Sequence, residues 1–221
     1  MLSLAANLLL HDRSALLVGA GAVGGRKLSY LLATGVDLSV VEPRPEPWLL
    51  ELERSGKLAI HESFSESLLD KSPLVFIASP EVEESMVSAI KERGLWLNVA
   101  GEPALGNFTL PALVEDGDFR LTVSTGGASP ALSAKVAAHL REEFKGYGEL
   151  CRILKLLREK ILTSNLEAMV RRRIFLSLAT ESDTLAGFLR EGKREEALKL
   201  LNQLIAPLKL PEDISWERGE E

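Results

Sequence analysis

The sequence holds only one cysteine, Cys151, so no disulfide can form within the chain. Proteins without disulfides are typical of reducing compartments, and we therefore expect a cytoplasmic protein. The only three histidines, His11, His61 and His139, lack the close spacing of metal ligands. The sequence thus predicts no resident metal, although a fold can still assemble a site from distant residues.

Net positive charge and long apolar runs are also missing. The formal net charge of −6 argues against nucleic acid as the main partner, because binding a phosphate backbone needs a basic surface. No apolar run reaches the length of a membrane span. Residues 1–10 are apolar but lack the basic start and the cleavage site of a signal peptide, and we expect them to pack on the first domain.

What is present is typical of a globular protein. Hydrophobic residues make up 46% of the 221 residues and charged residues 26%. A chain of this length can form one large domain or two small ones, and it can bury a sizeable core.

The most informative stretch is SALLVGAGAVGGRK, residues 14–27, in which an apolar run precedes Gly19, Gly21 and Gly24 at GxGxxG spacing. If Ala15–Val18 is a buried strand, Gly19 makes the tight turn, Gly21 admits a pyrophosphate and Gly24 allows close helix packing. The phosphates of a dinucleotide would then lie at a helix N-terminus, where free N–H groups and the helix dipole favour an anion. The alternative is a glycine-bearing turn without a ligand.

The residues that follow complete a dinucleotide-binding unit. We expect a helix from Ala22 to Thr34, ended by Gly35, and a strand from Val36 to Val41. Glu42 then stands at the end of this strand, where a carboxylate can accept both ribose hydroxyls and repel a 2′-phosphate. NAD is therefore preferred to NADP, although the positive charge of Arg44 weakens that preference.

Further strands and helices alternate as far as residue 100. We expect strands at 57–61, 73–79 and 95–100, with helices at 48–55 and 81–93 and a helical turn at 67–70. The prolines of residues 43–48 place a loop at the carboxyl edge of the sheet. This alternation predicts an α/β fold with a Rossmann-type, doubly wound parallel sheet.

The pattern changes after Pro103. Phe108–Val114 and Phe119–Ser124 are expected as two strands joined by a turn over Glu115–Asp118, followed by a helix from Pro130 to Phe144. Only helices are expected from Tyr147 onward, at 149–163, 166–178, 182–191 and 194–206. We therefore predict an NAD-binding domain (1–112), a short αβ dimerisation segment (113–146) and an all-helical C-terminal domain (147–221).

Two further motifs carry a family resemblance: NVAGEPALGNFTLPALV at residues 98–114 and VSTGGASPALSAKV at 123–136. With the glycine loop, they make about the first 145 residues resemble the siroheme synthase N-terminal family, the precorrin-2 dehydrogenases. The resemblance implies oxidation of precorrin-2, a tetrapyrrole, to sirohydrochlorin with NAD; some members also insert ferrous iron. It also implies a homodimer with intertwined connector segments and an active cleft between the nucleotide domain and the tail.

The resemblance also assigns candidate residues. Ala22 and Val23 fall in the glycine loop of the family, and Pro43 and Arg44 fall where it contacts NAD after the second strand. Ser79 falls at the end of the strand that flanks the cofactor cleft.

One position departs from the family pattern. The family frame NVVD carries an aspartate credited with both chemistries, and Gly101 stands at that position here. Glu102 is one residue away and one methylene longer, so it is the candidate acceptor for the proton released when the macrocycle is oxidised. The alternative is a solvated Glu102 and an enzyme that acts by binding and orienting its substrate.

A second candidate cluster precedes the helix at residue 130. Ser124 and Thr125 stand before two glycines and a helix N-terminus, an arrangement able to hold a substrate carboxylate, and Thr125 aligns with a family position implicated in metal access. The alternative is a turn with a helix cap. Arg26 and Lys27, beside the glycine loop, are a charge run that either is solvated or faces the ligand.

Three hypotheses follow for the function. The leading one is an NAD-dependent precorrin-2 dehydrogenase with little or no chelatase activity. The second keeps both activities, with Glu102 or a hydroxyl site serving the incoming metal. The third is an NAD-binding module in which Gly101 marks lost chemistry.

Overall fold

The computed structural model describes residues 4–206 and divides the chain into two compact units. The first unit ends at Leu110, and the second begins at Pro111. The second unit holds both the hairpin segment and the helices, so the predicted division into three parts remains a proposal. Residues 207–221 of the predicted helical domain lie outside the described residues.

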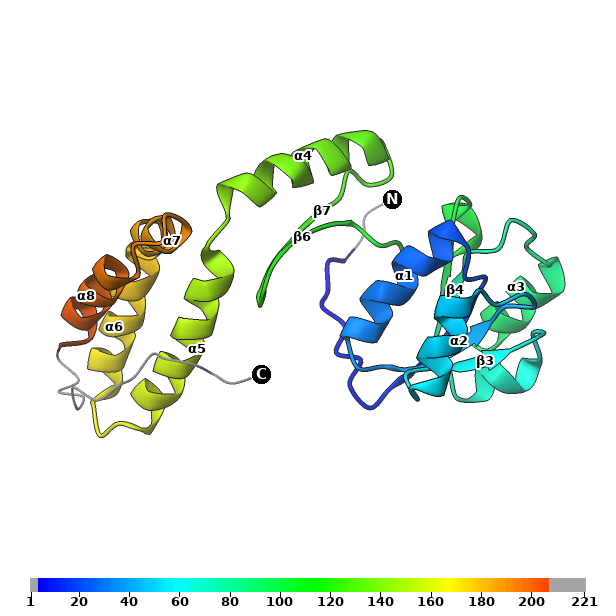
Figure 1. Cartoon of the computed structure of the whole chain (residues 1–221), viewed down its shortest axis with the longest axis horizontal. Helices are drawn as coiled ribbons and strands as arrows, with labels where there is room; N and C mark the ends of the chain where they lie inside the picture. Colours follow the sequence, from blue (N-terminus) through cyan, green and yellow to red (C-terminus); the bar gives the residue numbers. More distant parts are fainter. Residues whose placement is uncertain (1–3, 207–221) are drawn as a thin grey trace. The chain divides into compact units, whose positions relative to one another are not determined.

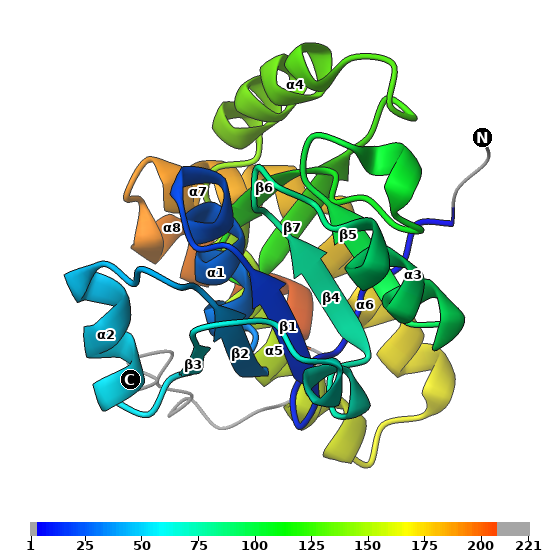
Figure 2. The ribbon, with the colours of Figure 1, turned by 90° about the vertical axis from the view of Figure 1, so that its right-hand side faces the viewer.

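A five-stranded parallel sheet forms the centre of the first unit (Figure 2). Its strands are β1 (Ser14–Val18), β2 (Asp37–Val41), β3 (Ala59–His61), β4 (Leu74–Ile77) and β5 (Trp96–Val99). They lie in the order β3-β2-β1-β4-β5, which confirms the predicted Rossmann-type α/β fold. Val18 is in register with Val41 and with Ile77, so the strands end together and their carboxyl ends share one edge.

Helices cover both faces of this sheet (Figure 1). They are α1 (Ala22–Ala33), α2 (Pro47–Arg54) and α3 (Glu84–Glu92), with short 3-10 helices η1 (Glu66–Asp70) and η2 (Pro103–Leu105). Leu28 of α1 and Leu49 of α2 are buried with strand residues of one face, whereas Met86 and Ile90 of α3 are buried with those of the other. Strand side chains alternate between the two clusters, as a buried parallel sheet requires.

The segment after η2 differs from the prediction, because residues 108–111 are not part of a strand. Asn107 instead lies beside the edge strand β5: its N–H donates to Leu97 O (2.9 Å) and its Nδ2 to Leu95 O (2.8 Å), while its Oδ1 accepts from Leu97 N–H (2.8 Å). A Cβ on Gly106 would lie 2.5 Å from Leu97 O, so glycine permits this approach. Asn107 thus supplies the hydrogen bonds that a sixth strand would otherwise make.

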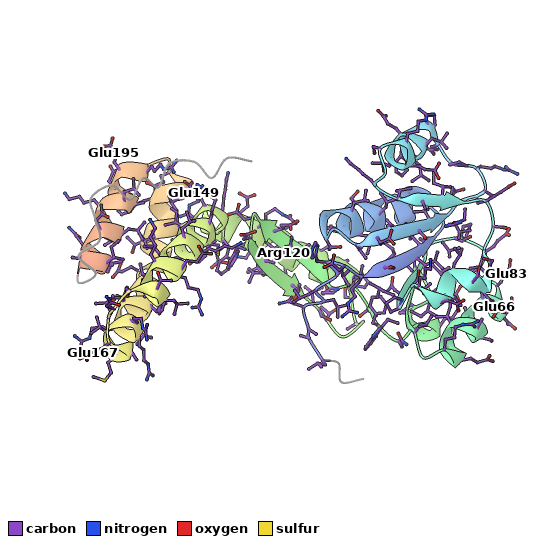
Figure 3. The ribbon with its side chains drawn as sticks, turned by 90° about the horizontal axis from the view of Figure 1, so that it is seen from below. Glu66, Glu83, Arg120, Glu149, Glu167 and Glu195 are labelled. Atoms are coloured by element: carbon purple, nitrogen blue, oxygen red, sulfur yellow. The ribbon has the colours of Figure 1, made fainter. Side chains whose placement is uncertain are left out.

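The second unit begins with an antiparallel hairpin of β6 (Ala112–Asp116) and β7 (Phe119–Val123). Gly117, with φ +56°, occupies the turn, which is shorter than the predicted Glu115–Asp118 because both acidic residues before Gly117 belong to β6. Across the strands, Arg120 forms an ion pair with Glu115 at 2.7 Å; Arg120 is labelled on the hairpin in Figure 3.

Helices complete the second unit, and all five predicted helices are confirmed within one to two residues at each end. They are α4 (Pro130–Glu143), α5 (Tyr147–Thr163), α6 (Ala168–Thr180), α7 (Ser182–Arg190) and α8 (Arg194–Ile205). One buried cluster joins α5 to α8 and includes Leu150, Leu157, Leu185 and Leu201. Among residues 4–206, no helix has both the length and the apolar character needed to cross a lipid bilayer.

Asp116 connects the hairpin to the helices. Its Oδ2 accepts from the N–H groups of Gly146 (2.8 Å) and Gly148 (3.0 Å) at the start of α5, so a carboxylate from the hairpin caps that helix. Phe119 of β7 packs on Phe144 and Tyr147 beside this cap, with ring centroids 5.6 and 4.9 Å away. The hairpin is therefore part of the same packed unit as the helices.

The expectation that residues 1–10 pack on the first domain is wrong for most of the described part of that segment. Leu4, Leu8 and Leu9 are exposed, at 92%, 54% and 88% of their surface. Leu10 alone packs against a core cluster of the first unit. Residues 1–3 lie outside the described residues.

Candidate functional site

The glycine loop connects β1 to α1 at the carboxyl edge of the sheet. Gly19 has φ +87°, and a Cβ there would lie 2.8 Å from the backbone N of Ser79. A Cβ on Gly24 would lie only 2.0 Å from Gly19 O. Both positions therefore require glycine, Gly19 for its left-handed backbone and Gly24 for the approach of α1 to β1.

Gly21 differs from the other two glycines of the motif. Its φ is −63°, and no atom lies within 4 Å of a Cβ built on it. It is the N-cap residue of α1, and no side chain caps this helix. The first N–H groups of an α-helix have no partner within the helix, so an uncapped start with open space at Gly21 fits a phosphate group at this helix N-terminus.

Glu42 closes the loop from the end of β2. Its Oε2 accepts from Ala20 N–H at 2.8 Å, and its Oε1 accepts from Arg44 N–H at 3.2 Å. The carboxylate is thereby held against the glycine loop, and each oxygen keeps a lone pair for a further donor. This placement fits a ribose that offers two hydroxyls.

The remaining cofactor candidates surround the same edge. Pro43 and Arg44 are exposed directly after Glu42, and half-buried Ser79 follows β4 with its Oγ accepting from Glu81 N–H at 3.3 Å. The sheet thus brings together the candidates from β1, β2 and β4, as the parallel topology predicts. Their contact with a dinucleotide remains a prediction.

Asn98, which the sequence analysis did not single out as a candidate, connects β5 to α1. Asn98 of β5 is 6% exposed, and its Oδ1 accepts from Lys27 Nζ at 2.7 Å. Lys27 is half-buried, so it is not the fully solvated member of a charge run, whereas its neighbour Arg26 is exposed. In the sequence, the feature that could have indicated Asn98 was a single amide side chain within the otherwise apolar strand WLNV.

Gly101 and Glu102 form a turn after β5. Gly101 has φ +83°, with nothing within 4 Å of a built Cβ, and Glu102 is the exposed N-cap residue of η2. The Glu102 carbonyl accepts from Leu105 N–H at 3.0 Å, so its backbone is held while its side chain faces solvent. A carboxylate in this position is free to contact a ligand.

Ser124 and Thr125 belong to the second unit, at the turn between β7 and α4. Thr125 Oγ1 donates to Ser129 O (3.1 Å) and accepts from Ser129 N–H (3.0 Å) and from the hydroxyl of Ser133 (3.2 Å). Ser129 caps α4 by accepting from Leu132 N–H. The Thr125 hydroxyl is thus occupied by the turn, which supports the helix-cap alternative for this residue.

Exposed Ser124 is less constrained. Its Oγ accepts from Gly126 N–H at 3.2 Å, which leaves the hydroxyl proton available for a ligand.

Over residues 4–206, no group of three His, Cys, Asp or Glu side chains is arranged to hold a metal ion.

Comparison with known proteins agrees with this geometry. Residues 6–112 match the model of a family described as NAD(P)-binding. The chain is 30% identical over 196 residues to a siroheme synthase of Psychromonas ingrahamii, covering 87% of this chain and 41% of the relative. It is 32% identical over 204 residues to siroheme synthase 1 of Halorhodospira halophila, covering 88% and 42%.

The chain is thus similar to part of the siroheme synthases, the family that its motifs resemble. Among solved structures, SirC, a precorrin-2 dehydrogenase, aligns with a TM-score of 0.72 over 91% of this chain and 100% of that one, at 24% identity. This alignment shows the same fold over both units, including the helical tail. The family match confirms the expectation of a nicotinamide dinucleotide cofactor.

The chain spans about two-fifths of the length of the siroheme synthases that it matches. These similarities therefore support the fold and the dinucleotide-binding domain, whereas the reaction is a proposal.

The two adjacent glycines of α1 allow a matched test of the loop. We expect Gly24→Ala to lower the free energy of unfolding by about 1–3 kcal/mol, because the new methyl group separates α1 from Gly19. NAD affinity should fall by about tenfold or more, which corresponds to about 1.4 kcal/mol. Urea unfolding and calorimetric titration with NAD measure the two effects.

Gly25→Ala is the control, because the nearest atoms to a Cβ there lie 3.9 Å away. It should keep NAD affinity and raise helix stability by about 0.5–1 kcal/mol. Equal NAD affinity in both variants would contradict the role assigned to Gly24.

Proposed function

We propose that the chain catalyses the NAD-dependent oxidation of precorrin-2 to sirohydrochlorin. The observation that carries this proposal is the intact glycine loop with Glu42 held against it by Ala20 N–H at 2.8 Å. Two similarities support it: the fold matches a precorrin-2 dehydrogenase over 91% of the chain, and the relatives are named siroheme synthases.

The proposed reaction removes two hydrogens from the macrocycle, one as a hydride and one as a proton. NAD, when bound, supplies the hydride acceptor. The glycine loop and Glu42 hold and orient the dinucleotide, and the main contribution of the chain to hydride transfer is this positioning. The proton needs an acceptor, and we propose the exposed carboxylate of Glu102, which follows β5 at the same sheet edge.

NAD rather than NADP is the proposed cofactor. The carboxylate of Glu42 lies where a ribose 2′-phosphate would have to fit, and two negative charges would repel each other there. Arg44 contributes only its backbone N–H to this arrangement among the contacts of the described chain.

The second unit offers a place for one of the carboxylates of the substrate. Gly126 and Gly127, with φ +62° and +87°, are separated from α4 by two residues, and the Gly126 N–H donates to Ser124 Oγ at 3.2 Å. This bond uses Ser124 Oγ as an acceptor and leaves its hydroxyl proton available to donate to a carboxylate. We therefore propose that Ser124 contacts the substrate and that Thr125 holds the turn.

A second candidate function is metal insertion into sirohydrochlorin, in addition to the oxidation. The relatives that this chain matches over part of their length are named siroheme synthases, and this name favours the second function. The metal would be a substrate in this case, and Glu102 or the Ser124 hydroxyl would be its contact. If the protein does not increase the rate at which sirohydrochlorin is lost in the presence of Fe²⁺, metal insertion is excluded.

The proposed oxidation can be tested directly. Anaerobic incubation with precorrin-2 and excess NAD should produce sirohydrochlorin and NADH in equal amounts, measured by absorbance. Tight NAD binding without NADH formation would contradict the proposal and favour a module that has lost its chemistry.

The role of Glu102 as proton acceptor can be tested by substitution. Glu102→Gln should lower kcat by about 10²-fold, because an amide cannot take up the proton, and should leave the Kd for NAD unchanged. Glu81→Gln, a matched change at another exposed glutamate of the first unit, should keep kcat. An unchanged kcat in Glu102→Gln would favour proton transfer to water or to the substrate itself.

We also propose that the chain forms a homodimer through the second unit. Within residues 4–206, the hairpin is a sheet of two strands, and Leu132 and Val136 of α4 are exposed at 51% and 36%. Unpaired strand edges and exposed apolar side chains are typical of a surface that a second copy covers.

Light scattering should give twice the mass of one chain, and Leu132→Glu should reduce it to the mass of a single chain. Leu4→Glu, at a residue that is 92% exposed outside the second unit, should leave the dimer intact. A monomeric wild-type chain at micromolar concentration would contradict the proposal.

A further inference from the structure

Lys27 makes an unusual connection across the first unit. It lies in the second turn of α1, and its Nζ donates to Asn98 Oδ1 of β5 at 2.7 Å, a contact between residues 71 positions apart. Its ammonium group also lies 5.7 Å from the centre of the Phe76 ring. A cation is thus held between a helix and the sheet that it covers.

Placing this charge there has a cost. Burial lowers the pKa of Lys27, and the neighbouring charge of Arg26 lowers this pKa further. The folded state therefore favours the charged lysine less than water does. An apolar side chain would cover Phe76 without this cost, so the amine must contribute something that a methyl group could not.

The ammonium determines how the amide of Asn98 is oriented. Lysine has donors only, so the amide must turn its oxygen toward Lys27 and its NH₂ group away. That NH₂ group donates to Phe108 O at 3.0 Å. Asn98 is 6% exposed, so water cannot readily replace either partner.

Phe108 O lies at the end of a loop that starts and finishes on β5. The chain leaves the sheet after the bond from Ala100 N–H to Ile77 O (2.8 Å) and returns at Asn107, whose N–H donates to Leu97 O (2.9 Å). Glu102 lies between these two anchors. The bond from Asn98 to Phe108 fixes the returning end of the loop and therefore the path that carries Glu102.

We propose that Lys27 is a positioning residue for the loop of residues 100–106, acting through Asn98. Its effect on the reaction rests on the proposed function, because it places the carboxylate assigned to the proton. Its effect on the loop does not depend on that function. Lys27 is separate from the phosphate-binding turn, which consists of backbone groups around Gly21.

The test uses Lys27→Met, which keeps an unbranched side chain over Phe76 and removes the donors. Hydrogen exchange of peptides covering residues 100–108 should become faster, because the amide of Asn98 is then free to turn. In turnover with precorrin-2 and NAD, kcat should fall by about 10-fold to 100-fold, while the Kd for NAD stays within about twofold. Lys91→Met, at an exposed lysine of α3, is the control and should change neither.

A double-mutant cycle of Lys27→Met and Asn98→Ala tests whether Lys27 acts through Asn98. If Lys27 acts through Asn98, the double variant should be no slower than Asn98→Ala alone. Additive losses in kcat would show that Lys27 does not act through Asn98. Unchanged exchange in Lys27→Met, or an equal loss of NAD affinity and kcat, would overturn the positioning role.

The outcomes also separate this inference from the proposed function. A wild-type chain that does not oxidise precorrin-2 contradicts the function, and the exchange measurement then decides the inference alone. Normal turnover in the wild type with unchanged exchange and kcat in Lys27→Met contradicts only the inference.

Discussion

The close approach of α1 to the end of β1 is the constraint on which the rest of the first unit depends. A Cβ at position 24 would lie only 2.0 Å from Gly19 O, so only glycine lets α1 start this close to the end of β1. This approach directs the uncapped first turn of α1 toward the sheet edge. It also places Ala20 N–H within reach of Glu42. The phosphate and ribose positions that we propose thus depend on a single backbone contact.

The other end of the same edge is held by amide side chains. Asn107 supplies the hydrogen bonds that a neighbouring strand would give to β5, and Asn98 holds the returning chain through Phe108 O. A buried amide lowers the stability of the fold unless its donors and acceptor have partners. The Asn98 oxygen accepts from Lys27, and its NH₂ group donates to Phe108 O. The loop that carries Glu102 is therefore a defined turn between two anchors. Its backbone is ordered by these bonds, while the carboxylate itself remains exposed.

The sequence predicted the parallel sheet and its order of motifs because the information is local. Buried strands such as Ala15–Val18 are continuous apolar runs, and the glycines stand where turns require them. Glu42 was predicted at the ribose position from its place after β2, and the structure puts it against the loop. These features need only neighbouring residues to be recognised.

The features that the sequence did not predict depend on contacts between distant residues. Phe108 was expected to begin a strand because its side chain is apolar, yet its neighbour Asn107 is bound to β5 and the strand begins at Ala112. Lys27 and Arg26 have the same charge and are adjacent, and only the helix orientation buries the first and exposes the second. The roles of Glu102 and Ser124 remain predictions, since both are exposed and contact with a substrate defines them.

The central claim is that the first unit binds NAD through the glycine loop and Glu42. Calorimetric titration of the whole chain with NAD and with NADP tests it most directly. We predict one NAD site per chain and weaker binding of NADP, because the carboxylate of Glu42 opposes a 2′-phosphate. Absence of binding by either dinucleotide, or tighter binding of NADP, would contradict it.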